Sequence, residues 1–83
     1  MKVSIHHHAA SRIIERGATE NEIVETVTNG ERFPAKFGRT GFRRNFPFSG
    51  LWRNRQFRTK QVEAFAVIEN DEWLVITVIV KYF

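Results

Sequence analysis

The sequence predicts an α+β domain in which two N-terminal helices pack on one face of a twisted antiparallel β-sheet. Apolar residues recur at helical spacing in the first third of the chain, and strand-like stretches at 56–69 and 73–83 end it. The short acidic segment between these two stretches is typical of a tight turn, so they should pair as a hairpin. Helices followed by a hairpin leave one sheet face open for a ligand.

The length of 83 residues predicts a single domain covering residues 1–83. The chain has no cysteine, which excludes a disulfide framework and thiolate zinc sites. The N-terminus lacks the apolar core of a signal peptide, and the longest apolar run, Trp73 to Val80, is too short to span a membrane. We therefore expect a cytoplasmic protein with no membrane partner, no cofactor and no metal. The oligomeric state is left open.

A first helix is predicted from about residue 5 to residue 16, because Ala9, Ala10, Ile13 and Ile14 recur there at helical spacing. Ser4 is expected to cap its N-terminus and Gly17 to follow its last turn. The residues before it are too few to assign.

A second helix should begin after Thr19, because Thr19 and Glu22 have the spacing of a capping box. Acidic residues in its first turn also favour the positive end of the helix dipole. The apolar stripe of this helix is Ile23, Val24 and Val27, and Asn29-Gly30 is expected to end it.

Regular structure is hard to assign from 31 to 55, where Gly and Pro recur. Short strands are expected near 32–37 and 42–46, followed by a loop from Pro47 to Asn54. In the strand 56–69, Arg58 and Lys60 lie on the face that becomes apolar further along.

The last strand, 73–83, is apolar on both faces through Val80, which predicts a central position in the sheet. Strict alternation would point Thr77 and Lys81 to one face. The residues expected on the other face are Ile76, Val78, Val80 and Tyr82.

The distribution of charge is the main indication of function. The net charge is +4, yet residues 32–62 contain nine of the thirteen Lys and Arg residues and no Asp or Glu. Aromatic residues are interspersed among these cations, and such a combination is typical of proteins that bind single-stranded nucleic acid. We hypothesise that the segment forms one exposed surface for RNA or another nucleic acid. The residues predicted to contact it are Arg16, Arg39, Arg43, Arg44, Trp52, Arg53, Arg55 and Lys81.

Two alternatives apply to the aromatic residues of this segment. Phe42, Phe46, Phe48 and Trp52 can stack on bases, or they can pack against the sheet or against a protein partner. Phe33, Phe57, Phe65 and Trp73 are more typical of a core.

The chain resembles the domain of unknown function 4258 family at His8-Ala9-Ala10-Ser11-Arg12, at Glu15-Arg16-Gly17, and at the capped helix that ends in Asn29-Gly30-Glu31. Ile76-Thr77-Val78 resembles the core of that family's last strand. The family is similar to the RelE/ParE-like toxins of the barnase, EndoU, colicin and RelE superfamily. This resemblance implies a RelE-like fold, and either a metal-independent endoribonuclease toxin with a cognate antitoxin partner or a catalytically silent relative.

Metal-free RNA cleavage uses the 2′-hydroxyl of the substrate as the nucleophile, and it needs a base, an acid and cations that stabilise the phosphorane. Imidazole groups exchange protons near neutral pH, while Arg and Lys bind phosphate oxygens. Thr77 can add a hydrogen bond. The residues predicted to be catalytic are His8, Arg12, Arg58, Lys60 and Thr77.

Structural alternatives apply to these residues as well. His8 can simply stabilise the start of a helix, and Arg12 and Arg16 can pair with Glu15 or Glu20. A metal site at His6 and His8 is not expected, because no third ligand is evident. Two other functions remain open: a non-catalytic nucleic-acid-binding module, and a protein-interaction module that accepts an acidic partner.

Overall fold

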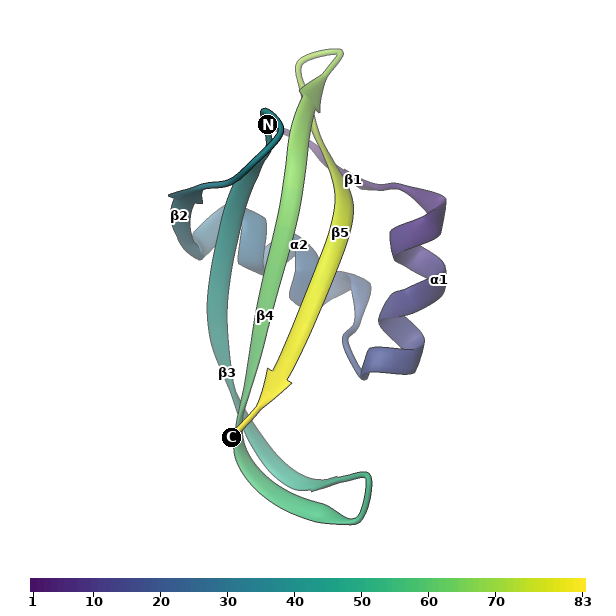
Figure 1. The fold of residues 1–83 in the computed structure, drawn as a ribbon, viewed down its shortest axis with the longest axis vertical. Helices are drawn as coiled ribbons and strands as arrows, with labels where there is room; N and C mark the ends of the chain where they lie inside the picture. The colour runs from purple at the N-terminus through teal and green to yellow at the C-terminus, as the bar shows by residue number, and fades with distance from the viewer.

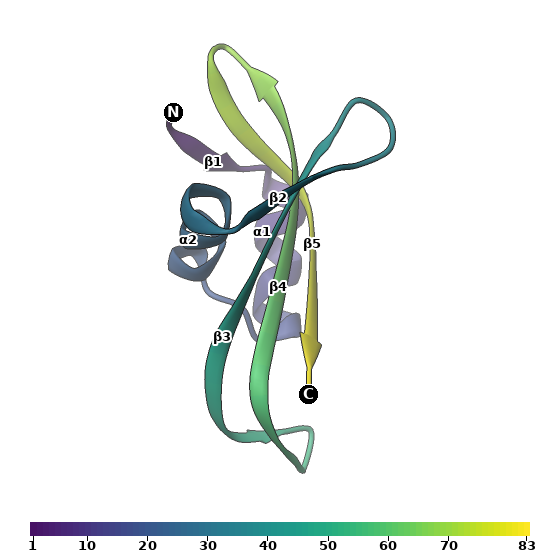
Figure 2. The same cartoon turned by 90° about the vertical axis from the view of Figure 1, so that its left-hand side faces the viewer.

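The structure, a computed structural model, describes residues 1–83 and has the predicted α+β class, with two helices and one five-stranded sheet. Both helices lie on the same face of the sheet, with α2 behind β3 and β4 and α1 beside β5 (Figures 1 and 2). We call the opposite, uncovered face of the sheet the open face. The elements are β1 (Val3–Ile5), α1 (His7–Arg16), α2 (Glu20–Asn29), β2 (Glu31–Pro34), β3 (Thr40–Trp52), β4 (Arg55–Glu69) and β5 (Glu72–Tyr82).

The strand order is β1-β5-β4-β3-β2, and every neighbouring pair is antiparallel except β1 and β5. β1 pairs with β5 only over Trp73–Val75, so the rest of β5 is a free edge on that side. The predicted central position of β5 is therefore correct only for its first residues. Neither helix is long and apolar enough to cross a membrane.

Helix α1 begins later than predicted. Ser4 lies in β1, and the N-cap is His6, whose ring Nδ1 accepts a hydrogen bond from the His8 N–H at 3.2 Å. Ser4 was the wrong cap because pairing with β5 keeps residues 3–5 extended. The predicted end is confirmed: Gly17 adopts φ 81°, a left-handed conformation that costs glycine little.

The capping box of α2 is confirmed. The Glu22 N–H donates to Thr19 Oγ1 at 3.1 Å, and the Thr19 N–H donates to Glu22 Oε1 at 2.9 Å. The helix ends at Asn29, as predicted, and Gly30 follows it in an extended conformation. Each of these features depends on residues three or four positions apart, which explains why they could be recognised locally.

The predicted loop from Pro47 to Asn54 was wrong. β3 continues to Trp52 and pairs with β4 as far as Trp52 and Arg55, with one register shift between Pro47 and Gly50. Arg53 and Asn54 form the turn with φ 52° and 66°, the left-handed pair that suits the twist of a two-residue hairpin. We call residues 47–58 the hairpin arm, which extends beyond the body of the sheet (Figure 1).

The hydrophobic core lies between the helices and the sheet. Arg58 and Lys60 were predicted to share a strand face with apolar residues, and Lys60 is indeed buried in line with Val62, Ala64 and Ala66. The core residues are Ala9, Ile13, Ala18, Ile23, Val27, Phe42, Val62, Ala64, Ala66, Trp73, Val75 and Val78.

The strict alternation predicted for β5 is interrupted by a bulge. Phe65 pairs with Thr77 and Ala66 pairs with Val75, so Ile76 is an extra residue without a partner in β4. As a result Val75 and Val78, which strict alternation would place on opposite faces, are both buried in the core. Thr77 lies opposite Phe65 at the border of the open face.

Candidate anion-binding site beside the free edge of the sheet

A cavity of about 280 Å³ lies between α1 and the free edge of β5. It exists because β1 ends at Ile5 and leaves β5 without a strand neighbour beyond Val75. We call it the anion cavity. Its lining residues are His8, Ala9, Arg12, Arg16, Ile76, Thr77 and Val78.

Three polar residues reach this cavity from one face of α1. His8, Arg12 and Arg16 are spaced by four residues, and this spacing aligns side chains along a helix. One guanidinium nitrogen of Arg16, Nη1, donates to the backbone carbonyl of Val78 on the free edge of β5. That bond holds the Arg16 side chain at the sheet, and its other N–H groups remain for a ligand.

The electrostatics of the anion cavity favour an anion. Its lining contains two guanidinium groups and no carboxylate. The alternative in which Arg12 and Arg16 pair with Glu15 or Glu20 is not observed, because neither arginine takes part in any ion pair. Two guanidinium groups without carboxylate partners are well suited to hold phosphate oxygens.

The three histidines lie together at the start of α1. Their ring centroids are 4.3 Å apart for His6 and His7, 4.3 Å for His7 and His8, and 5.2 Å for His6 and His8. Their possible ligand atoms all lie within 4.8 Å of one another, so His7 is the third potential metal ligand that the sequence analysis did not identify. Two features oppose a metal ion here: His6 Nδ1 already accepts the His8 N–H, and the N-terminus of a helix repels cations.

The basic stretch does not form the single exposed surface that was predicted, and that hypothesis was wrong. Lys60 is only 8% exposed, with its Nζ 2.8 Å from the Glu22 carboxylate and 3.0 Å from the Gly17 carbonyl oxygen. It lies on the helix-facing side of the sheet, outside the anion cavity. Arg58 is also outside the cavity, on the hairpin arm next to Phe83.

Three of the predicted nucleic-acid contacts are engaged in ion pairs. Arg43 Nη2 lies 2.7 Å from Glu63, and Arg43 also pairs with Glu31 at 3.3 Å. Arg44 pairs with Glu25 at 3.4 Å, and Lys81 pairs with Glu63 at 3.4 Å. Because Arg43 and Lys81 stand on either side of one carboxylate, they have little capacity left for phosphate.

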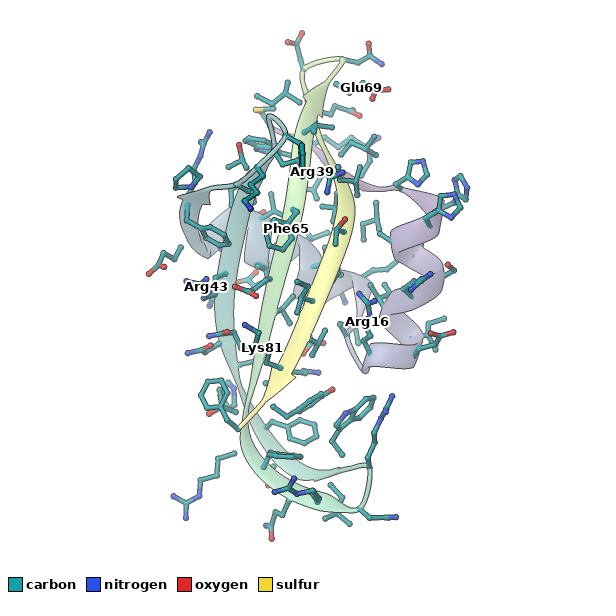
Figure 3. The ribbon with its side chains drawn as sticks, viewed as in Figure 1. Arg16, Arg39, Arg43, Phe65, Glu69 and Lys81 are labelled. Carbon is teal, nitrogen blue, oxygen red and sulfur yellow. The ribbon has the colours of Figure 1, made fainter.

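The unpaired cations of the stretch lie in separate parts of the molecule. Arg32 lies on β2, Lys36 and Arg39 belong to the turn between β2 and β3, and Arg53, Arg55 and Arg58 belong to the hairpin arm. The turn and the hairpin arm lie toward opposite ends of the long axis, and Figure 3 shows Arg39 in the upper part of the sheet and Arg16 to the side, on α1.

Trp52 packs within the protein, in agreement with the structural alternative. Its ring stacks on Tyr82 with a centroid distance of 4.7 Å, and Phe48 and Phe57 also pack on Tyr82 at 5.1 Å and 5.7 Å. The Tyr82 hydroxyl donates to the Arg16 carbonyl oxygen at 3.0 Å. Burial raises the pKa of Tyr82, the Glu22 charge raises it further, and the Arg53 charge partly offsets both effects.

Glu63 was missed in the sequence. It is 5% exposed although its side chain belongs to the open face, because Arg43 and Lys81 cover it. Glu31, Arg43, Glu63 and Lys81 thus form a charge ladder across four neighbouring strands. The only sequence signal for Glu63 was its position directly after the acid-free stretch. The strand register that pairs it with Arg43 could not be read from the sequence.

Comparison of the chain with protein-family models, with curated proteins and with solved structures finds no match. The resemblance to the domain of unknown function 4258 family therefore stays a prediction. The anion cavity, which brings His8, Arg12, Arg16 and Thr77 together, is the best-supported candidate site.

Proposed function

We propose that the protein is a RelE-like RNA-binding protein that holds a phosphodiester in the anion cavity and cleaves it without a metal ion. One observation carries this proposal: His8, Arg12, Arg16 and Thr77 line one cavity that contains no carboxylate. The first three come from α1 and the fourth from the far end of the chain, so only the folded protein brings them together.

The two arginines supply the affinity for the phosphate. Arg12 and Arg16 offer planar donor groups that match two oxygens of a phosphodiester. Thr77 offers a hydroxyl at the opposite wall. RNA is the expected ligand because its backbone repeats this anion, and because the exposed Arg53, Arg55 and Arg58 of the hairpin arm add long-range attraction.

His8 is the residue that we assign to proton transfer. In the proposed reaction its imidazole takes the proton of the 2′-hydroxyl, the 2′-oxygen bonds to phosphorus, and the bond from phosphorus to the 5′-oxygen breaks. The leaving oxygen takes a proton from a second imidazole, for which His7 lies 4.3 Å from the His8 ring. Arg12 and Arg16 stabilise the charge that develops on the phosphorus oxygens.

The test is a binding and cleavage measurement with labelled single-stranded RNA in the presence of a chelator. His8→Ala should bind RNA with native affinity and lose cleavage, because it removes only the base. Arg12→Gln should weaken binding roughly tenfold, as the loss of one charged phosphate contact. Ser11→Ala is the matched control on the same helix and should change neither.

Two results would contradict the proposal. Native protein that fails to bind RNA at low salt excludes an RNA site altogether. Cleavage that His8→Ala leaves unchanged excludes the assigned base. Expression without a partner should also arrest growth if cleavage makes the protein a toxin, and His8→Ala should relieve that arrest.

A non-catalytic RNA-binding module is the second candidate. It is favoured by the fact that only one imidazole, His8, lines the anion cavity. RNA that is bound with the predicted dependence on Arg12 but is never cut would support this candidate over the nuclease.

A further inference from the structure

A second hollow lies on the open face of the sheet, beside the anion cavity. It has a volume of about 400 Å³ and is mainly apolar. Its floor comes from Phe33 on β2, Phe65 on β4 and Ile79 on β5, and the turn between β2 and β3 forms its rim with Lys36, Phe37 and Arg39. In Figure 3 Phe65 lies in the middle of the sheet, with Arg39 toward the upper end.

Two aromatic rings of the hollow are fixed in place. The Phe33 ring lies so close to Gly41 that a Cβ there would come within 2.3 Å of it. The Arg43 guanidinium covers the same ring at 4.5 Å from its centroid, and Phe65 meets it edge to face at 5.9 Å. The floor is therefore a rigid aromatic surface.

Phe37 is the unusual residue of the rim. It is 86% exposed, and its backbone has φ 60°, a left-handed conformation that bulky residues rarely adopt. Folding gains nothing from an aromatic ring held in water on strained backbone, and such arrangements occur at ligand sites. The ring is thus available to cover something that enters the hollow.

The hollow and the anion cavity meet at Thr77, which lines both of them. A polymer that crosses the free edge of β5 at Thr77 would place one repeating unit in the anion cavity and the next one in the hollow. Within the hollow, Lys36 and Arg39 add positive charge and no carboxylate is present. The occupant should therefore combine an apolar planar group with a repeating anionic backbone.

We propose that the hollow is a base-binding subsite for single-stranded RNA. With a phosphate in the anion cavity, the base of a neighbouring nucleotide enters the hollow between Phe37 and the aromatic floor, while Lys36 and Arg39 contact the adjoining phosphate. This inference rests on the proposed function and adds a preference for an unpaired base, since a base in a duplex would have to break its pairing and stacking to enter.

The size of the hollow agrees with this occupant. Its volume lies at the lower end of the range for ligand pockets, roughly 300–1,000 Å³, which suits one planar ring better than a folded segment. Aromatic stacking is tolerant of sequence, because every base presents a flat face. The subsite should thus select unpaired nucleotides without strong preference among bases.

The experiment compares the affinities of the native protein for a single-stranded RNA and for an abasic oligomer with the same ribose-phosphate backbone. We expect the abasic oligomer to bind roughly tenfold to hundredfold more weakly, the loss of stacking on one or two bases. Phe37→Ala should lower the affinity for the complete RNA to nearly that for the abasic oligomer, and it should leave the affinity for the abasic oligomer unchanged.

Leu51→Ala is the matched control, because Leu51 is another exposed apolar residue, on the hairpin arm and outside the hollow. It should have no effect on either oligomer. Circular dichroism should show native folding of Phe37→Ala, since an exposed ring contributes little to the core. The Phe37 variant thus remains informative even though the backbone around it is strained.

The outcomes separate the two proposals. Equal binding of the complete and abasic oligomers, or an equal effect of Phe37→Ala on both, would overturn the subsite and leave the RNA proposal intact. Native protein that binds neither oligomer would overturn both. Binding of RNA without any base dependence, combined with Phe37-dependent binding of an acidic peptide, would overturn the subsite and assign the hollow to a protein partner.

Discussion

The cations in the middle of the sheet differ from those at its two ends, although all of them come from one acid-free stretch. Arg43, Arg44 and Lys60 in the middle are each paired with a carboxylate. The turn between β2 and β3 and the hairpin arm carry cations that have no acidic partner. The unpaired end cations are Lys36, Arg39, Arg53, Arg55 and Arg58. The ninth cation, Arg32 on β2, also has no carboxylate partner, and its guanidinium lies over the Trp73 ring, 5.2 Å from the centroid.

This difference arises because acids from other elements are brought next to the middle of the stretch. α2 supplies Glu22 and Glu25, β2 supplies Glu31, and β4 supplies Glu63. The arginines of the hairpin arm lie beyond these acidic residues, so none of them forms an ion pair. A run of positive charge in a β-rich sequence therefore does not predict a positive surface, since the neighbours across the strands decide which charges are paired.

The largest effect is expected where the hairpin arm packs against the helices. Gly17→Ala should destabilise the protein by about 4 kcal/mol, from left-handed strain and from overpacking. A Cβ at Gly17 would lie 2.2 Å from the Tyr82 hydroxyl and 2.7 Å from the Trp52 ring. Urea unfolding would measure the change in the free energy of unfolding.

Gly38→Ala is the matched control for that substitution. Gly38, in the turn between β2 and β3, has a similar φ of 69°, and a Cβ there would meet nothing within 4 Å. It should therefore cost only the backbone strain, about 1–2 kcal/mol. Equal losses for the two variants would show that the arm does not pack on Gly17.

The free energy of unfolding should fall when one residue of an ion pair in the middle of the sheet is replaced. Lys60→Met should lower the free energy of unfolding by about 3 kcal/mol, because it leaves the Glu22 carboxylate half-buried without its cation. Arg58→Met on the exposed arm should change it by less than about 0.5 kcal/mol. The double variant Lys60→Met with Glu22→Gln should recover part of the loss, and a double variant no more stable than Lys60→Met would argue against this pairing.

The two regions should also differ in how salt affects RNA affinity. Arg55→Gln at the arm should reduce the slope of log affinity against log salt by roughly one, because one phosphate contact is lost. Arg43→Gln should leave that slope unchanged, since Arg43 is already neutralised by Glu63. A reduced slope for Arg43→Gln would mean that the ion pairs of the middle open in the presence of RNA.

The smallest effect concerns pH. Because the pKa of Tyr82 is raised in the folded protein, folding favours the neutral phenol, and this stabilising contribution is present below about pH 10 and lost as pH rises through the folded pKa. Tyr82 is the only tyrosine, so tyrosinate absorbance reports its ionisation directly. Urea unfolding at higher pH should become easier for the native chain and less so for Tyr82→Phe. An equal loss in both would assign the alkaline sensitivity to other groups.

Much of the fold could be predicted because its signals are local. The capping box of Thr19 and Glu22, the end of α1 at Gly17 and the strands around the acidic turn at Asn70 and Asp71 all depend on residues within a few positions of each other. The loop predicted at Pro47 failed because Pro and Gly are tolerated in a strand that has a free edge and a register shift.

The candidate site was only half predictable for a similar reason. The spacing of His8, Arg12 and Arg16 places them on one helix face in any α-helix, and Thr77, which was predicted for the same site, lines the same cavity from β5. Lys60 and Arg58 were assigned to the same site, but Lys60 faces the core and Arg58 lies on the arm. The assignment of Phe33 and Phe65 to the core was wrong: both rings line the hollow on the open face, next to Phe37, because their strand register turns them away from the helices.

The sequence by itself determined the α+β class, the last residue of α1, both ends of α2 and the positively charged face of α1, since these follow from short-range backbone and side-chain geometry. Only the tertiary structure decided which arginines are paired with acids and which cavity they line. Strand register and the bulge at Ile76 determine which side chains face the helices and which lie on the open face. A shift of one residue in a strand would exchange every side chain between the two faces of the sheet.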